Sequence, residues 1–236
     1  MVMPLRIYAR LMSIKPKDII IKPIKSEVAR EFVRKYHYSG KVVQNSQLHF
    51  GCYVGERLGG VLQFGSCTDK KKMLSLVTDT GWNDFIELNR MVFVDWLPRN
   101  SESRCIAICM RLIKKHYPNI KWVISFADAT QCGDGTIYRA SGFLLTNIKK
   151  NNTLRISPAG QIMHSIQASH LKIAKEWNAW QSVPGFQLRY IYFIDKSMVS
   201  NLTVPILSFD KIDKLGAGMY KGEKITLQAR REKKDV

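Results

Sequence analysis

The chain lacks the features that mark membrane, secreted and zinc-binding proteins. No apolar run approaches the roughly 18 residues that a membrane-spanning helix needs. The first residues, MVMPLRIYARLMSIKPKD, hold no long apolar core followed by a small-residue cleavage site, so we expect no secretory signal. The five cysteines form no CxxC pair, and their odd number and spacing fit neither a disulfide framework nor a zinc knuckle. We therefore expect a cytoplasmic protein, in a reducing compartment.

Acidic residues are also scarce. The chain has 19 Asp and Glu against 37 Lys and Arg, which gives a formal net charge of +18 and a pI near 9.8. Such an excess of positive charge on a folded chain is typical of proteins that bind polyanions. Nucleic acid is the first candidate partner and an anionic membrane surface the second, while the alternative is that the basic composition only aids solubility.

The rest of the composition is that of an ordinary soluble globule. Hydrophobic residues make up 45% and charged residues 24%, which excludes wholesale disorder, collagen and a coiled-coil rod. A length of 236 residues suits one domain with an extension or two small domains. We find no internal repeat, and the pattern changes after Pro158. We expect a main domain over residues 1–160 and a C-terminal extension over 161–236.

Hydrophobic periodicity predicts alternating strands and helices. In order, we expect a strand at 19–24, a helix at 26–35, a hairpin of strands 48–54 and 58–64, a long strand at 85–95, a helix at 102–116, a buried strand at 122–127, a short helix at 135–143 and a second hairpin of strands 144–148 and 153–156. After these we expect a packing helix over 161–180, a strand over 185–195 that finishes the sheet, and a basic tail.

Two charged residues stand out within this order. Arg90 falls in the apolar phase of the long strand, with Ile86, Leu88 and Val92, where an unpaired guanidinium is costly. It is either half of a structural ion pair or a functional arginine. Asp128 ends the buried strand, where ligands of open α/β sheets bind, although a cap or turn aspartate is the alternative.

The start of the helix at 102–116 combines hydroxyls, arginines and backbone N–H groups that the helix itself leaves unused. Such a helix start is suited to hold phosphate. Ordinary capping by Asn100 or Ser101 is the alternative. The residues that we expect to contact a phosphate-bearing cofactor are Arg99, Asn100, Ser101, Ser103 and Arg104.

The order of elements resembles the GCN5-related N-acetyltransferase superfamily, and IYRASGF at residues 137–143 is similar to its tyrosine-to-Gly-Phe signature. The resemblance implies an α/β (α+β) fold with a mixed, mostly antiparallel central sheet flanked by helices. It also implies that residues 1–160 are catalytic and that a coenzyme A thioester is the cofactor, cradled by the helix start. The superfamily's loop is glycine-rich, whereas residues 98–104 contain no glycine.

Longer strings resemble the Mom family of phage DNA-modification proteins: residues 37–39, 48–65, 87–91, 95–104 and, above all, WVISFADATQCGDGTIYRASGF at 122–143. That resemblance implies a transferase that places a methylcarbamoyl-type group on the exocyclic amine of adenine, which protects phage DNA from restriction. The implied partners are double-stranded DNA and a small-molecule group donor. The alternatives are an acetyltransferase for a protein or small-molecule amine, and a DNA-binding protein with an inactive transferase fold.

Residue roles follow from that resemblance and from the chemistry of a poorly nucleophilic amine. Asp128 is the expected base, Arg90 the charge partner or anion stabiliser, and Tyr138 the acid that protonates a departing thiolate. Ser101 and Ser103 are expected to hold donor oxygens, and Tyr53 lies on the opposing hairpin.

His37 and Tyr38 follow the helix at 26–35, near the expected substrate side. They are either a histidine on the helix dipole beside a packing tyrosine, or they handle protons or, with Asp128, bind iron, with which the resembled family is associated. The target base must leave the duplex stack, and the candidate stacking aromatics are Tyr36, Tyr38, Tyr53 and Phe64. The sequence leaves open whether the protein is a monomer or a homodimer.

Overall fold

The computed structural model describes residues 14–129, 133–150, 152–183, 185–215, 219–220 and 223–224. The basic residues at both chain ends and residues 130–132, which follow the candidate Asp128, lie outside the described residues. The chain divides into two compact units. Among described residues, the first unit holds 14–125, 140–143 and 191–204, and the second holds 126–129, 133–139, 144–190 and the residues from 205 onward.

The central element is a seven-stranded sheet in the order β1-β2-β3-β4-β5-β10-β6. Its strands are β1 (Ile20–Pro23), β2 (Ser46–Val54), β3 (Arg57–Gly65), β4 (Phe85–Phe93), β5 (Trp122–Asp128), β6 (Leu144–Lys150) and β10 (Phe186–Phe193). The β1–β2, β2–β3 and β3–β4 pairs are antiparallel, and the β4–β5 pair is parallel. The expected mixed, mostly antiparallel sheet is therefore confirmed.

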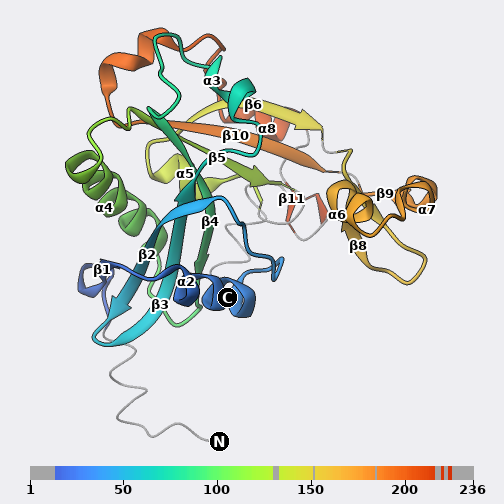
Figure 1. Cartoon of the computed structure of the whole chain (residues 1–236), viewed down its shortest axis with the longest axis horizontal. Helices are drawn as coiled ribbons and strands as arrows, with labels where there is room; N and C mark the ends of the chain where they lie inside the picture. The colour runs from blue at the N-terminus through green and yellow to red at the C-terminus, as the bar shows by residue number, and fades with distance from the viewer. Residues whose placement is uncertain are drawn as a thin grey trace, which may run out of the picture. The chain divides into compact units, whose positions relative to one another are not determined.

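Helix α2 (Ser26–Tyr36) covers one face of β2, β3 and β4 (Figure 1). Its Ala29, Phe32 and Val33 form a core cluster with Val61 of β3 and Val92 of β4, which face each other in the strand register. Burial of this stripe explains why the segment is helical, because isolated helices of this length are marginal in water. The apolar pattern of the sequence places Val28, Ala29, Phe32, Val33 and Tyr36 on one stripe, but Val28 and Tyr36 are 40% and 45% exposed, so the buried stripe is narrower.

Helix α4 (Ser101–His116) packs through Cys105, Ile106, Cys109 and Ile113, all of which are fully buried. The thiol of Cys52, on β2, is hydrogen-bonded to Cys105, so α4 packs against the sheet there. Cys105 and Cys109, four residues apart on the helix, both face the core. The last turn of the helix carries three basic residues, which suit the negative end of its dipole.

A β-bulge in β4 overturns part of the predicted phase of Arg90, which stays in step with Val92 but not with Leu88. Phe64 of β3 pairs with Leu88, but the next residue back, Gln63, pairs with Arg90, so Asn89 is the extra residue of the bulge. Side chains that face each other across an antiparallel pair lie on one side of the sheet. Arg90 therefore shares the face of Gln63, and Leu88 lies on the other face. The prediction that Arg90 alternates in step with Leu88 is wrong.

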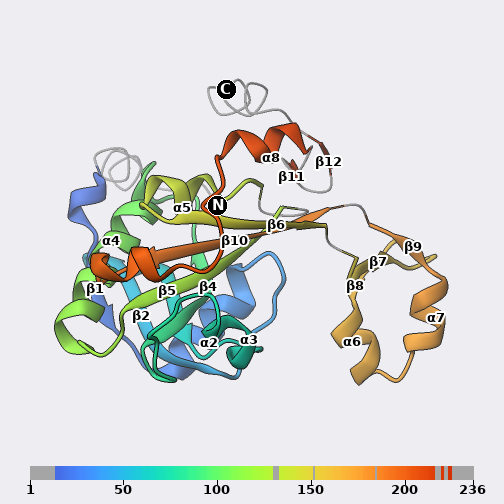
Figure 2. The same ribbon diagram turned by 90° about the horizontal axis from the view of Figure 1, so that it is seen from above.

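The second unit contains a three-stranded sheet in the order β8-β7-β9, made of β7 (Leu154–Ile156), β8 (Ile162–His164) and β9 (Gln181–Ser182). The predicted hairpin of strands 144–148 and 153–156 is wrong, because β6 and β7 belong to different sheets. The predicted helix over 161–180 is also wrong. That segment begins with β8 and continues as two short helices, α6 (Ser165–His170) and α7 (Ala174–Ala179) (Figure 2).

Lys172, between α6 and α7, has a positive φ of 59°. This left-handed conformation cannot continue an α-helix, so the chain forms two short helices instead of one. Trp177 then packs on Met163 and Ala168 in a small core of its own. The remaining elements are short: η1 (Pro16–Asp18), α3 (Lys70–Leu74), α5 (Thr136–Ala140), η2 (Lys196–Asn201), α8 (Asp210–Lys214), β11 (Met219–Tyr220) and β12 (Glu223–Lys224). Among the described helices, none has the length and hydropathy to cross a membrane.

Candidate active site

A row of polar side chains crosses the α2 face of the sheet in the first unit. His49 of β2 faces Gln63 of β3, and Gln63 faces Arg90 of β4. Gln63 is fully buried and its Nε2 lies 3.2 Å from Nδ1 of His49. Its Oε1 is buried without a hydrogen-bond partner among the described residues. An unsatisfied buried oxygen is costly, so this row departs from what stability alone favours.

Arg90 is held in place by two backbone carbonyls. Its Nη1 donates to the carbonyl oxygen of Asn89 at 2.8 Å, and its Nε donates to that of Lys41 at 3.2 Å. Carbonyl acceptors fix the plane of a guanidinium but leave its formal charge in place. The half-buried arginine is therefore a rigid, positively charged group beside the C-terminal end of α2.

His37 lies near this guanidinium and is neutral at physiological pH. Its backbone N–H donates to the carbonyl of Val33 at 2.9 Å, which places it at the C-cap of α2. Burial of the imidazole, followed by the charge of Arg90, lowers the pKa of His37 to about 4. The N–H of Ser39 donates to Nδ1 at 3.1 Å, and the ring of Tyr38 lies 4.3 Å from the imidazole. The structure thus brings together three predicted site residues: His37, Tyr38 and Arg90.

Glu87 joins this cluster because of the bulge. It pairs with Gly65 on β3, two residues from Gln63, and so lies on the same face as Arg90. Burial raises the pKa of Glu87, while hydrogen bonds to Cys67 and Asn89 and the charge of Arg90 oppose the rise. Burial also raises the pKa of the Cys67 thiol, which therefore stays protonated. A buried carboxyl with a raised pKa beside an arginine is typical of functional sites.

Glu87 is not among the site residues predicted from the sequence. The available signal was the run Glu87–Leu88–Asn89–Arg90, three polar residues within a strand that is otherwise apolar. Asn89 extends the polar cluster, because its Oδ1 accepts from the hydroxyl of Ser46 at 3.2 Å. Gly65 is required here, because a Cβ at that position would come within 2.0 Å of the carbonyl oxygen of Asn45.

The predicted phosphate-binding loop precedes α4 in the same unit. Asn100 has a φ of 69° and makes no side-chain cap hydrogen bond, so the predicted capping by Asn100 is wrong. Asparagine is the residue after glycine that best tolerates this left-handed conformation. The hydroxyls of Ser101 and Ser103 donate to the carbonyls of Pro98 and Asn100.

Arginines surround the same loop. Arg99 is exposed, whereas Nη2 of Arg104 donates to the carbonyl of Lys17 at 3.4 Å. Arg57, at the start of β3, stacks over the ring of Trp96 at 4.1 Å. Gly59 leaves room for this packing, since a Cβ there would lie 2.8 Å from the Trp96 ring. Tyr53, on β2, lies under Lys22 at 5.7 Å and is half-buried.

Asp128 and Tyr138 belong to the second unit. Asp128 is the last residue of β5 and is half-buried, and the N–H of the next residue, Ala129, donates to the carbonyl of Phe186 at 2.8 Å. The ring of Tyr138 stacks on that of buried Tyr190 at 5.2 Å. Gly135 has a φ of 69°, and a Cβ there would lie 2.6 Å from the Tyr190 ring, which explains the glycine.

Of the four candidate stacking aromatics, Phe64 is excluded because its side chain is fully buried. Tyr36 and Tyr38 are 45% and 58% exposed at the end of α2. Among the described residues, no three His, Cys, Asp or Glu side chains gather as a metal site. The predicted set of His37, Tyr38 and Asp128, which includes a tyrosine, stays a prediction.

The model of the Mom protein family matches residues 18–211 of the chain. The methylcarbamoylase Mom of Escherichia phage Mu is 34% identical over 189 residues, which are 76% of this chain and 77% of that protein. Among solved structures, the spermidine/spermine N-acetyltransferase SpeG from Vibrio cholerae aligns with a TM-score of 0.48 at 7% identity, over 77% of this chain and 96% of that one. The Drosophila melanogaster polyamine N-acetyltransferase aligns with a TM-score of 0.46 at 9% identity, over 74% and 99% of the two chains.

Proposed function

The chain belongs to the Mom protein family, and from this premise we propose that it is a transferase that places a methylcarbamoyl group on the exocyclic amine of adenine in double-stranded DNA. The observation that carries the proposal is the 34% identity to a methylcarbamoylase over 76% of the chain. The +18 net charge supports a DNA partner, because lysines and arginines that neutralise phosphates release counterions. Modified adenine would protect phage DNA from restriction in the host cytoplasm.

The reaction needs help at two points, because the adenine amine is a poor nucleophile. Its nitrogen attacks the donor carbonyl, so a base must take a proton and a cation must stabilise the negative charge that develops on oxygen. We propose Arg90 as that cation, since its guanidinium is fixed by two carbonyls and keeps its charge. Asp128 is the proposed base, and Tyr138 the proposed acid for the leaving group.

The chemistry at the start of α4 supports a donor that carries phosphate, and a coenzyme A thioester is the donor we propose. Asn100 supplies the left-handed residue that a glycine would otherwise provide. The hydroxyls of Ser101 and Ser103 donate to carbonyls of the loop itself. We therefore propose that Arg99 and the N–H groups of the first turn of α4 contact the phosphate. When bound, the donor would supply the activated carbonyl.

Iron is a further proposal for the same protein, with His37 and Tyr38 of the first unit as ligands. The imidazole of His37 suits a metal, because it is neutral at physiological pH and a neutral imidazole is the form that binds a metal. Iron would supply a Lewis acid at the site.

The target adenine must be extruded from the duplex, at a cost of a few kcal/mol. Tyr36 and Tyr38 are the aromatics we propose for stacking, because both are exposed at the end of α2 that carries His37. Exposed Arg34, Lys35 and Lys41 surround them and would contact the flanking phosphates.

Nucleoside mass spectrometry tests the proposed function. Plasmid DNA from cells that make the protein should yield an adenine nucleoside heavier by one methylcarbamoyl group, and the DNA should resist restriction enzymes that contact adenine. Cells with the empty plasmid are the control. Unmodified adenine in well-expressing cells would overturn the proposal, and acetyl transfer to peptides would replace it by the acetyltransferase alternative. Full modification by Asp128→Ala would remove Asp128 from the mechanism.

A further inference from the structure

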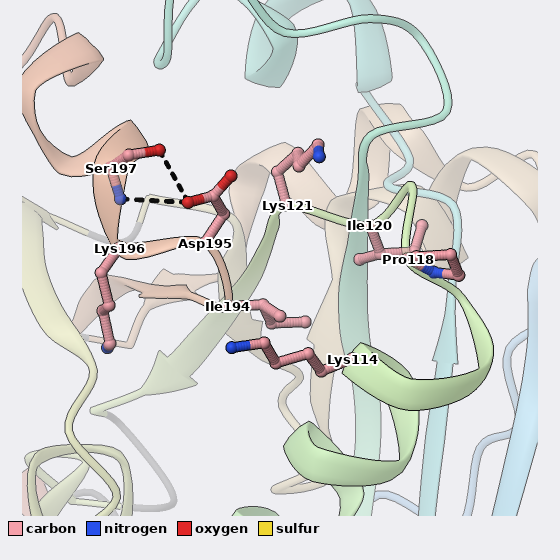
Figure 3. Close-up of a pocket in the computed structure, with 8 residues that line it drawn as sticks. All are labelled: Lys114, Pro118, Ile120, Lys121, Ile194, Asp195, Lys196 and Ser197. Carbon is pink, nitrogen blue, oxygen red and sulfur yellow. Dashed lines mark hydrogen bonds between the residues drawn. The ribbon is translucent and has the colours of Figure 1, made fainter.

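A basic cavity lies in the first unit, away from the residues assigned above. Its volume is about 440 Å³, and it is lined by Lys114, Pro118, Ile120, Lys121, Ile194, Asp195, Lys196 and Ser197. The lining comes from three segments: the last turn of α4 and the loop after it, the residues that enter β5, and the residues that leave β10 for η2. Figure 3 shows the lysines of these segments around Asp195.

The one carboxylate of the cavity is already engaged. Asp195 Oδ1 accepts from the N–H of Ser197 at 3.1 Å and from its hydroxyl at 2.7 Å (Figure 3). These hydrogen bonds, and to a lesser degree the charges of Lys121 and Lys114, lower the pKa of Asp195, so it is ionised. Three ammonium groups against one carboxylate leave the lining with an excess of two positive charges, and exposed Lys115 and His116 extend the basic surface beyond it.

The floor of the cavity is apolar, with buried Ile120 and Ile194, whereas Lys114 and Lys196 are exposed. Cations at the rim of a shallow depression can approach an anionic partner without losing their hydration first. Helix α4 has 16 residues and is therefore about 24 Å long, which matches about seven base pairs of duplex. One duplex is long enough to extend from the start of α4 to its end.

We propose that this cavity binds the phosphodiester backbone of DNA, at a point several base pairs from the modified adenine, with Lys114, Lys121 and Lys196 as its cations. This inference rests on the proposed function, since it assigns a second contact to the same DNA. DNA is favoured over a free nucleotide because the cations sit at an exposed rim that continues into Lys115 and His116. The lysines at the end of α4 also offset its dipole, and Nζ of Lys196 lies 4.4 Å from the centre of the Tyr192 ring. Neither contact neutralises a charge, so the cavity keeps its excess of positive charge.

Salt dependence of DNA binding is the test. For a duplex of about 24 base pairs, the plot of log affinity against log salt should lose a slope of about 2 to 3 in the variant Lys114→Gln/Lys121→Gln/Lys196→Gln, because each lost phosphate contact removes about 0.9. The matched control, Lys71→Gln/Lys72→Gln/Lys175→Gln, removes the same charge from exposed lysines elsewhere and should keep the slope. For a duplex of about 8 base pairs centred on the target, the two variants should behave alike.

Asp195→Asn should change the DNA affinity in the opposite direction. It removes the only negative charge of the cavity and should tighten binding to the long duplex, which a purely structural role of the lysines would not produce. An unchanged slope in the triple lysine variant, or an equal loss in the control, would overturn the inference. Lysine-dependent binding of ADP without a change in the DNA slope would overturn it in favour of a nucleotide. If the wild-type protein binds no DNA at all, the proposed function fails as well. If it binds DNA but the triple lysine variant keeps the slope, only the inference about the cavity fails.

Discussion

Arg90 Nε lies 3.2 Å from the carbonyl oxygen of Lys41, a residue 49 positions earlier in the chain. This hydrogen bond ties the central strand β4 to the segment that follows α2. That segment also carries His37 and Tyr38, so the contact fixes the distance between the guanidinium and the end of the helix. The candidate site of the first unit thus depends on one long-range backbone acceptor.

Replacing Arg90 by lysine should abolish most activity while the fold remains. A lysine keeps the charge, but its single ammonium cannot reproduce the planar group that bonds two carbonyls. Loss of one fixed donor to a developing oxyanion typically costs about 10²–10³ in rate. Modified adenine per expressed protein is the readout, and Arg111→Lys, an exposed arginine on α4, is the control. Equal modification by both variants would exclude Arg90 from the chemistry.

His37 should make stability depend on pH between about 6.5 and 4. The folded chain takes up a proton on this histidine only near pH 4, whereas the unfolded chain does so near the ordinary value of 6.5. The free energy of unfolding should therefore fall as the pH drops through this window, by up to about 1.4 kcal/mol per pH unit, and level off below it. His37→Asn keeps an acceptor for the Ser39 N–H without titrating, so urea unfolding of this variant should show a smaller fall. Parallel pH curves would contradict the assignment.

Asn100 should be replaceable by glycine but not by alanine. Its φ of 69° favours glycine, and its side chain makes no cap hydrogen bond that a substitution would remove. Alanine in this conformation costs about 1 kcal/mol, whereas glycine adopts it freely. Urea unfolding should therefore show a loss for Asn100→Ala and almost none for Asn100→Gly. An equal loss in both variants would mean that the amide group itself stabilises the loop.

The elements with strong periodicity could be predicted from sequence, and the reasons are visible in the core. Helix α2 buries Ala29, Phe32 and Val33, and the continuous apolar run of β5 is almost entirely buried. The segment 161–180 also looks periodic, but a left-handed Lys172 divides it, and no propensity rule assigns that conformation to lysine. The sequence prediction of one helix therefore failed there.

The candidate site could be predicted only in part. Arg90 stands out as a charged residue in an apolar strand, and His37 as a histidine just after a predicted helix, and the structure groups them. Glu87 and Gln63 become partners of Arg90 only through the register of β3 and β4 and the bulge at Asn89. Strand register and bulges depend on contacts between distant segments, so a period-two pattern cannot reveal them.

Glu87→Gln should separate stability from activity. Burial raises the pKa of Glu87, so the folded chain holds this proton to higher pH than the unfolded chain does, and the stability that results is lost as the pH rises through the raised value. The glutamine variant cannot ionise, so as the pH rises above the ordinary carboxyl value of 4.5 it should lose less stability than the wild type. Activity should fall roughly tenfold, as expected from losing one interaction of about 1.4 kcal/mol with Arg90. The control, Glu27→Gln, changes an exposed carboxyl on α2 whose pKa is lowered, so above pH 4.5 it should alter neither the pH dependence of stability nor the activity. If Glu87→Gln keeps full activity, the carboxyl serves only the packing around Cys67.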